Sequence, residues 1–167
     1  MMELTWCQRK RGNMKSIIDL SKVTQVAVIC KDVEATKRQY ALFLGTEVPP
    51  TCDGGPFEIT QCEYMGKPSP ESNCKMAFFN MNNIQIEIIE PNGKQSTWQD
   101  FLDETGGGIH HIAFQVYDMQ EAIKACEELG MKLTQWGKYN DASGEYAYLD
   151  SKGQLGCYVE LLHSYAK

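Results

Sequence analysis

The apolar and polar positions of this chain predict a strand followed by a helix near its start. Residues 23–30 (Val-Thr-Gln-Val-Ala-Val-Ile-Cys) are rich in β-branched side chains, as buried strands are. Asp32 is a suitable helix N-cap, residues 33–44 carry apolar side chains near one face, and Gly45 is a suitable terminator. We therefore predict one strand and one helix, in that order.

The same pattern returns in the second half of the chain. Each residue from 23 to 32 pairs with the residue 86 positions later, so that Ala27 corresponds to Ala113 and Asp32 to Asp118. A helix is again predicted after the strand, and both helices end in Leu-Gly. Such a repeat predicts two copies of one unit, each too small to bury much core alone, that pack together.

The remaining apolar segments complete the two copies. Residues 98–104 predict a short helix, and Gly-rich residues 106–108 predict a hinge between the halves. Further strands are predicted at residues 57–65, 75–80, 84–90, 132–138, 145–149 and 157–162. The order strand–helix–strand–strand–strand occurs twice, which indicates the α+β class. We expect an N-terminal extension at residues 1–21, a first βαβββ module at residues 22–105 and a second at residues 106–167, all in one domain.

Composition narrows the functions that this chain can have. The 167 residues are 43% hydrophobic and 23% charged, with a net charge of −6 and a pI near 5.1. Nucleic-acid binding proteins need clustered Lys and Arg to contact phosphates, so this acidic balance argues against that class. No apolar run approaches the roughly 20 residues that cross a bilayer. We expect no nucleic-acid partner and no membrane partner.

The cysteines indicate a reducing compartment. There are seven, an odd number, and no two have the C-x-x-C spacing of zinc ribbons and redox motifs. Several lie in apolar stretches, where a free thiol behaves as a small hydrophobic group. We therefore expect all seven to be reduced and the protein to be cytoplasmic.

Four polar residues interrupt the apolar strands at related places. Gln25 lies in the first strand of the first module, and His111 takes the matching place in the second. Glu87 lies in the last strand of the first module, and Glu160 in the last strand of the second. The four residues thus occupy two positions, each used twice, and a pseudo-twofold arrangement would bring them together.

A divalent cation would explain why carboxylates stand among apolar neighbours. An uncompensated buried carboxylate costs several kcal/mol, and a cation between the four groups removes that cost. One imidazole, two carboxylates and one amide oxygen suit Zn, Co, Mn or Ni, whereas Mg seldom takes imidazole. The sequence therefore predicts one divalent metal ion per site, held by Gln25, Glu87, His111 and Glu160.

Each of these residues, taken singly, also has a simpler interpretation. A lone Glu near a strand end is usually solvated, and a lone His is more often a hydrogen-bonded polar residue than a ligand. The repeat is what favours a metal site. We expect His110 to face the opposite side of its strand from His111 and, like His163 near the C-terminus, to be structural or solvent-exposed.

A resemblance to a known superfamily rests on three segments. They are residues 86–91 (Ile-Glu-Ile-Ile-Glu-Pro), 108–114 (Gly-Ile-His-His-Ile-Ala-Phe) and 159–162 (Val-Glu-Leu-Leu). These segments resemble the glyoxalase/bleomycin-resistance/extradiol-dioxygenase superfamily, also called vicinal oxygen chelate, over about residues 22–163. Within it, the chain looks most like methylmalonyl-CoA epimerases and lactoylglutathione lyase-related proteins. The resemblance implies paired βαβββ modules, a cup-shaped mixed eight-stranded sheet around the metal, and a homodimer.

The resemblance also distinguishes between the activities of this superfamily. The first-strand ligand falls on Gln25, where epimerases usually have His, while His111 and Glu160 match well. Gln25 departs from the two-His, one-carboxylate triad of the extradiol dioxygenases, which argues against iron-dependent oxygenation. A Gln, Glu, His, Glu set is similar to that of eukaryotic-type glyoxalase I. Bleomycin-binding relatives lack the ligand set, which argues against their function here.

Epimerases and glyoxalases both remove a proton alpha to a carbonyl through a metal-stabilised enolate. By resemblance, Glu160 is expected to be a ligand and the base, and Glu63, or else Glu58, the second acid/base that epimerisation needs. The expected function is a methylmalonyl-CoA epimerase-like isomerase acting on an acyl-CoA. The alternatives are a glyoxalase I-like lyase acting on a glutathione adduct and a non-catalytic small-molecule binding protein. Glutathione carries two carboxylates that suit Arg, yet Arg38 is the only Arg beyond the extension, which favours the acyl-CoA.

Overall fold

The computed structural model describes residues 18–165, and the predicted extension at residues 1–21 lies outside this range except for its last four residues. In chain order the elements are β1 (Ile18–Ile29), α1 (Val33–Leu44), β2 (Cys52–Asp53), α2 (Phe57–Thr60), β3 (Glu63–Tyr64), β4 (Lys67–Pro68), β5 (Cys74–Asn80), β6 (Gln85–Pro91), α3 (Thr97–Thr105), β7 (Gly108–Val116), α4 (Met119–Glu128), β8 (Lys132–Lys138), β9 (Gly144–Asp150), α5 (Lys152–Leu155) and β10 (Tyr158–Ser164). The first strand thus begins at Ile18, earlier than residue 23.

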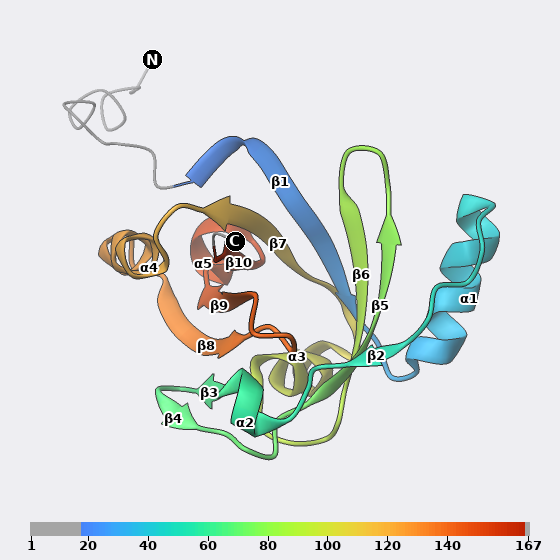
Figure 1. Cartoon of the computed structure of the whole chain (residues 1–167), viewed down its shortest axis with the longest axis horizontal. Helices are drawn as coiled ribbons and strands as arrows, with labels where there is room; N and C mark the ends of the chain where they lie inside the picture. The colour runs from blue at the N-terminus through green and yellow to red at the C-terminus, as the bar shows by residue number, and fades with distance from the viewer. Residues whose placement is uncertain (1–17, 166–167) are drawn as a thin grey trace.

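One curved mixed sheet holds the ten strands of this described range, in the order β2-β5-β6-β1-β7-β10-β9-β8-β3-β4. The first module contributes β1, β2, β5 and β6, and the second contributes β7 to β10. These eight strands confirm the predicted pair of βαβββ modules. Figure 1 shows that the sheet is strongly curled and that α1 and α4 lie at opposite ends of it.

Local sequence signals set the helices that flank the sheet. The Asp32 carboxylate accepts a hydrogen bond from the Ala35 amide at 2.8 Å, and Gly45 ends α1 with a left-handed φ of 66°. Asp118 caps α4 in the same way, since its carboxylate accepts from the Glu121 amide. Both predicted caps are therefore confirmed. Helix α4 buries Met119, Ala122, Ile123 and Cys126 against β9 and β10.

The segment predicted as a strand at residues 57–65 is different in the structure, so that prediction was wrong in part. Pro56 precedes a single helical turn, α2, and Gln61 ends the turn with a φ of 48°. The chain then crosses to the second module, where Glu63 of β3 pairs with Trp136 of β8. Strands β3 and β4 extend the expected eight-stranded sheet at that edge, because β8 offers unpaired backbone groups there.

The Gly-rich residues between the halves form a tight connection. Gly106, Gly107 and Gly108 have φ values of 79°, 116° and 126°. A Cβ on Gly107 would lie 2.8 Å from the carbonyl oxygen of Ile29, at the end of β1. The close approach of β1 and β7, which joins the two modules, therefore requires a glycine at this place.

Two further findings bear on the predictions from composition. None of the helices in residues 18–165 has the length and apolar character that crossing a bilayer demands. The cysteines of this range (Cys30, Cys52, Cys62, Cys74, Cys126 and Cys157) are all free, as expected, while Cys7 lies outside it.

Candidate metal centre

The central strand pair reproduces the sequence repeat in space. Strands β1 and β7 are antiparallel, with Gln25 opposite Ala113 and Ala27 opposite His111. Gln25 and His111 are repeat-related, and so are the two alanines. The pairing is therefore reciprocal, as a pseudo-twofold axis between the strands requires. The two alanines fill little volume, which leaves space over the middle of this strand pair.

The outer strands add one carboxylate from each side of this axis. Glu87 of β6 lies opposite Ala27 in a parallel pair, and Glu160 of β10 lies opposite Ala113 in the other parallel pair. Residues that are opposite each other in neighbouring strands place their side chains on the same face of the sheet. Both carboxylates therefore reach the face on which His111 lies, as the sequence predicted.

Three of the four predicted ligands converge in the interior. His111 Nε2 lies 3.0 Å from Glu160 Oε2 and 3.4 Å from Glu87 Oε2, and the side chains of these three residues are 0%, 5% and 7% exposed. One ligand atom from each lies within 4.8 Å of the others. None of the three atoms has a partner with hydrogen-bond geometry among residues 18–165. Three orphaned polar atoms in one buried place are an unstable arrangement unless a positive ion joins them.

The distances between these atoms suit a transition-metal ion. Two ligands that are each about 2.1 Å from a metal lie roughly 3.0 Å apart in an octahedral site and roughly 3.4 Å apart in a tetrahedral one. The distances from His111 to Glu160 and Glu87, 3.0 Å and 3.4 Å, lie within this range. The residues present therefore fit the divalent metal expected from the sequence.

The two carboxylates of the cluster favour a positive charge between them. In the metal-free protein, a proton on His111 provides that charge. Burial lowers the pKa of His111, but the carboxylates of Glu160 and then Glu87 outweigh it and raise that pKa from 6.5 to about 9. Burial, with the charge of Glu160, raises the pKa of Glu87, although His111 opposes this. Two carboxylates thus compete for one positive charge, and a divalent ion would serve both.

Gln25, the fourth predicted ligand, is 8% exposed and lines the same cavity as the two glutamates. Its Nε2 donates to Gln85 Oε1, and Gln85 Nε2 in turn donates to Asn80 Oδ1 at 2.6 Å. In this chain of amides the side-chain nitrogen of Gln25 is occupied by a hydrogen bond, so its side-chain oxygen is the atom that could bind a metal. Gln25 as a metal ligand stays a prediction.

His110 does not face away from His111, so that prediction was wrong. Val28 pairs with Ile109 and Ala27 with His111, which makes His110 an extra residue in a β-bulge. The bulge interrupts the alternation of side chains, and both imidazoles come to the buried face with their Nδ1 atoms 2.9 Å apart. Burial, with the charge of His111, lowers the pKa of His110 well below its usual value. His163 instead contacts Glu145 Oε1 at 3.2 Å, near the end of β10.

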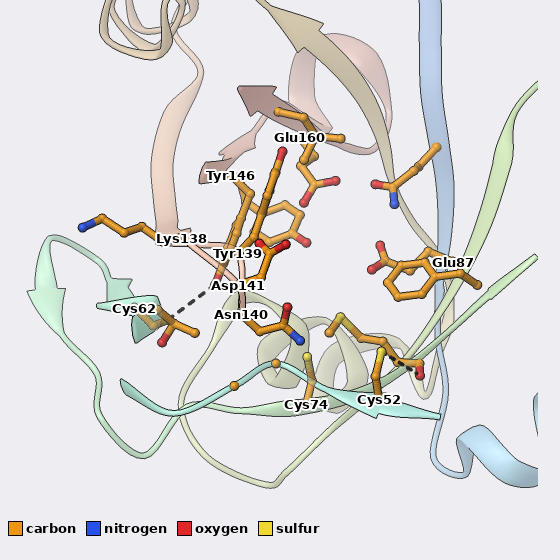
Figure 2. A pocket seen from close by; sticks show the side chains of 18 of the residues that line it. Cys52, Cys62, Cys74, Glu87, Lys138, Tyr139, Asn140, Asp141, Tyr146 and Glu160 are labelled. Atoms are coloured by element: carbon orange, nitrogen blue, oxygen red, sulfur yellow. Dashed lines mark hydrogen bonds between the residues drawn. The ribbon is translucent and has the colours of Figure 1, made fainter. Parts of the chain in front are cut away.

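A cavity of about 460 Å³ opens beside the cluster. Figure 2 shows Glu87 and Glu160 pointing into it, while residues from α2, β2, β5 and the β8–β9 turn form the remaining walls. The residues that line it include Cys62 but not the neighbouring Glu63, which lies in the short strand β3. The alternative candidate, Glu58, is an exposed residue of α2. The structure brings neither predicted second acid/base residue to the cavity wall.

Several of the residues that line this cavity were not predicted from the sequence. Three thiols, Cys52, Cys62 and Cys74, line the cavity, and burial raises the pKa of each, so they are neutral, weakly polar groups. Tyr146 and Tyr148 also line it, and Tyr148 pairs with Glu160 across β9 and β10. The spacing of two between these tyrosines places them on one strand face, a signal that the sequence did contain.

Comparison with known proteins agrees with this arrangement. The family model for the Glyoxalase/Bleomycin resistance protein/Dioxygenase superfamily matches residues 24–148. The ethylmalonyl-CoA/methylmalonyl-CoA epimerase of Cereibacter sphaeroides is 30% identical over 145 residues, which cover 85% of this chain and 97% of that protein. The human mitochondrial methylmalonyl-CoA epimerase is 27% identical over 148 residues, 87% of this chain and 76% of that protein.

A solved structure shares the fold at lower identity. The crystal structure of methylmalonyl-CoA epimerase from Mycobacterium tuberculosis aligns with a TM-score of 0.61 and 17% identity, covering 93% of this chain and 95% of that chain. The curled mixed sheet built from two βαβββ modules is thus the fold that these proteins have in common.

Proposed function

Because this chain belongs to the glyoxalase/bleomycin resistance protein/dioxygenase superfamily, we propose that it is a metal-dependent enzyme that epimerises a malonyl-CoA-type thioester, with methylmalonyl-CoA as a substrate. The relative from Cereibacter sphaeroides, which this chain covers over 97% of its length, supports the substrate class. The observation that carries the proposal is the buried convergence of Glu87, His111 and Glu160 beside a cavity. Within residues 18–165, Glu87 Oε2, His111 Nε2 and Glu160 Oε2 have no partner with hydrogen-bond geometry, and a shared metal ion would serve all three atoms.

The residues of this chain have distinct parts in the proposed reaction. Glu87, His111 and Glu160 would hold the metal, with Gln25 as the predicted fourth ligand. The metal, when bound, supplies a Lewis acid that stabilises negative charge on a carbonyl oxygen as the alpha proton leaves. Glu160 points into the cavity (Figure 2) and is the proposed base, because its carboxylate can reach both the ion and a substrate placed beside it.

Epimerisation also needs an acid on the second face of the alpha carbon. Glu63 is the residue that the sequence predicts for this part, and its position off the cavity wall gives that role no support. The thiols and phenols that line the wall have raised pKa values, so they stay protonated near neutral pH and are hydrogen-bond donors rather than bases.

A glyoxalase I-like lyase is the second candidate, and the cationic residues argue against it. Glutathione carries two carboxylates, which bidentate Arg side chains bind well. Arg38 lies on α1, 61% exposed, where it contacts Glu34, and no arginine in residues 18–165 lines the cavity. Lys138 does line it, and its Nζ lies 2.6 Å from Gln61 Oε1. The third candidate, a non-catalytic small-molecule binding protein, predicts ligand capture without turnover.

Hydrogen exchange at the substrate alpha carbon tests the three candidates together. In deuterated buffer with added cobalt or zinc, the protein should exchange the alpha proton of methylmalonyl-CoA. E160Q should lose this exchange, by about 10²-fold or more, whereas E127Q, an exposed residue of α4, should keep it. Turnover of a glutathione hemithioacetal without exchange would instead support the lyase. Binding with neither reaction would support the non-catalytic protein.

The remaining expectations from the sequence stay predictions. They are the identity of the metal among Co, Zn, Mn and Ni, the homodimer, and the cytoplasmic location. An acyl-CoA as the small-molecule partner follows from the proposal above.

A further inference from the structure

We propose that His110 is a positioning residue for the metal ligand His111: its Nδ1 accepts the Nδ1 proton of His111 and so leaves the lone pair of His111 Nε2 for the metal. This inference rests on the metal site of the proposed function. It concerns how the imidazole is oriented and which nitrogen carries the proton, and it assigns His110 no contact with the substrate.

The contact between the two rings permits a small number of proton arrangements. The Nδ1 atoms are 2.9 Å apart and buried, which is a hydrogen-bond distance that needs one proton between two nitrogens. His111 Nε2 is the atom that faces Glu87 and Glu160, so it must be unprotonated when a metal binds there. The proton of His111 is then on Nδ1, and His110 Nδ1 must be the acceptor.

The packing around His110 fixes its ring in the orientation that this bond needs. His110 is 0% exposed, and its ring centroid lies 4.7 Å from that of Tyr158, 5.0 Å from that of Phe101 and 5.5 Å from that of Tyr148. Aromatic rings on three sides leave little room for another rotamer. The acceptor atom is therefore held in place before any metal arrives.

The β-bulge in β7 explains how two consecutive residues can cooperate in this way. In a regular strand, neighbours point to opposite faces and could not share a proton. His110 is the extra residue between the Val28–Ile109 and Ala27–His111 pairs, so its side chain turns toward the same face. Metal-bound histidines usually donate their second N–H to a carboxylate, a carbonyl or water. Here the acceptor is the preceding histidine.

Nuclear magnetic resonance on the zinc-loaded wild-type protein tests the bond directly. With ¹⁵N-labelled histidine, the proton on His111 Nδ1 should show scalar coupling to the Nδ1 nitrogens of both rings. Absence of the coupling to His110, in a protein that binds zinc, would overturn this inference and leave the metal site intact. If the wild-type protein bound no zinc at all, the proposed function and this inference would both fail.

Two amide variants separate positioning from mere packing. In H110N the side-chain oxygen can take the place of Nδ1, whereas in H110Q the amide reaches the place of Nε2. We expect H110N to bind zinc within about threefold of wild type and H110Q to bind it about 10–100-fold more weakly, as for other residues that support a ligand. Circular dichroism checks that both variants fold. Equal zinc affinity in both variants and the wild-type protein would contradict the role, and the wild-type spectrum decides the matter if neither variant folds.

Discussion

Glu160 Oε2 lies 3.0 Å from His111 Nε2, although the two residues belong to different strands and are far apart in the sequence. Strands β10 and β7 are parallel neighbours, and the register that places Glu160 opposite Ala113 leaves the carboxylate free to reach the imidazole. Glu87 has the same relationship to β1 on the other side. The positions of His111 and the two glutamates are thus a consequence of backbone pairing between strands that the core already fixes.

Removal of a ligand should abolish metal binding. The wild-type protein should bind metal in about a 1:1 ratio, and we expect H111A and E160Q to lose it. Changing a residue that only supports a ligand costs about 10–100-fold in metal affinity, so removing one of the three converging ligands should cost at least as much. Elemental analysis after dialysis measures the metal content. H163A removes an imidazole that contacts Glu145 instead, and should keep the metal. Metal retained by H111A would contradict the site.

The stability of the metal-free protein should fall as the pH rises from 6.5 to 9. Burial opposes protonation of His111, but the Glu160 and Glu87 carboxylates raise its folded-state pKa to about 9, against 6.5 as its ordinary value. Between these two pKa values the folded protein keeps a proton that the unfolded chain has released, and this proton stabilises the fold. The stabilisation is fully present below pH 6.5 and is lost as the pH rises to 9 and above. The change is on the order of 3 kcal/mol.

Urea unfolding in the presence of a chelator, at pH 6.5 and at pH 9, measures this change. H163A serves as the control and should show the same loss. Metal binding should have the opposite pH dependence, since the ion displaces the proton from His111. A metal-free protein equally stable at both pH values would show that the carboxylates do not hold a proton on His111.

The sequence and the structure make different predictions about the role of Glu63 in catalysis. If Glu63 were the second acid/base, E63Q should reduce alpha-proton exchange or racemisation by about 10²-fold or more. The structure lines the cavity with Cys62 instead. We therefore expect E63Q to keep activity within about threefold of wild type, far from the loss typical of an acid/base residue. A large loss of kcat in a folded E63Q protein would require that β3 move toward the substrate.

The convergence of Glu87, His111 and Glu160 could be predicted from the sequence because it follows from pairing rules. The offset of 86 residues between the first strands places Gln25 and His111 at equivalent positions, and β1–β7 pairing makes that equivalence spatial. A strand inside an apolar core has one register that buries its apolar side chains. That register also determines where the polar side chains within the strand lie. No local pattern was needed beyond the repeat itself.

What the sequence could not predict depends on tertiary contacts or on broken alternation. Residues 57–65 have an apolar content that suits a strand, yet Pro56 begins a helical turn and Glu63 pairs with the edge of β8, far along the chain. The prediction for His110 assumed that side chains alternate between the two faces, as they do in a regular strand. The β-bulge at His110 breaks this alternation and turns its side chain toward the other face. The hydrogen bond between the two histidines was invisible for that reason.

Gly107 should be much less tolerant of substitution than its neighbour Gly106. Both have positive φ values, 116° and 79°, but a Cβ on Gly107 would lie 2.8 Å from the Ile29 carbonyl oxygen, while one on Gly106 would meet nothing within 4 Å. We expect G106A to destabilise the protein by about 1–2 kcal/mol through its backbone conformation alone. G107A should cost about 1–3 kcal/mol more, because β1 and β7 must move apart. Urea unfolding of the two variants measures the difference, and equal values would contradict the close approach.

Removal of the Gln25 side-chain amide should lower metal affinity, and its replacement by a stronger ligand should raise it. Its amide nitrogen donates to Gln85 Oε1, so the oxygen is the atom left for the ion. Q25A removes a neutral, weak ligand and should lower zinc affinity by about tenfold, whereas Q25H offers an imidazole, which zinc prefers, and should raise it. Isothermal titration with zinc measures both.

The control for Gln25 is its partner in the amide chain. Q85A leaves the Gln25 oxygen in place but removes the group that orients it, so a smaller loss of zinc affinity than in Q25A is expected. The order of affinities should therefore be Q25H, wild type, Q85A and Q25A. If all four proteins bound zinc equally, the site would consist of Glu87, His111 and Glu160 with the remaining positions left to water or substrate, and Gln25 would be a wall residue of the cavity.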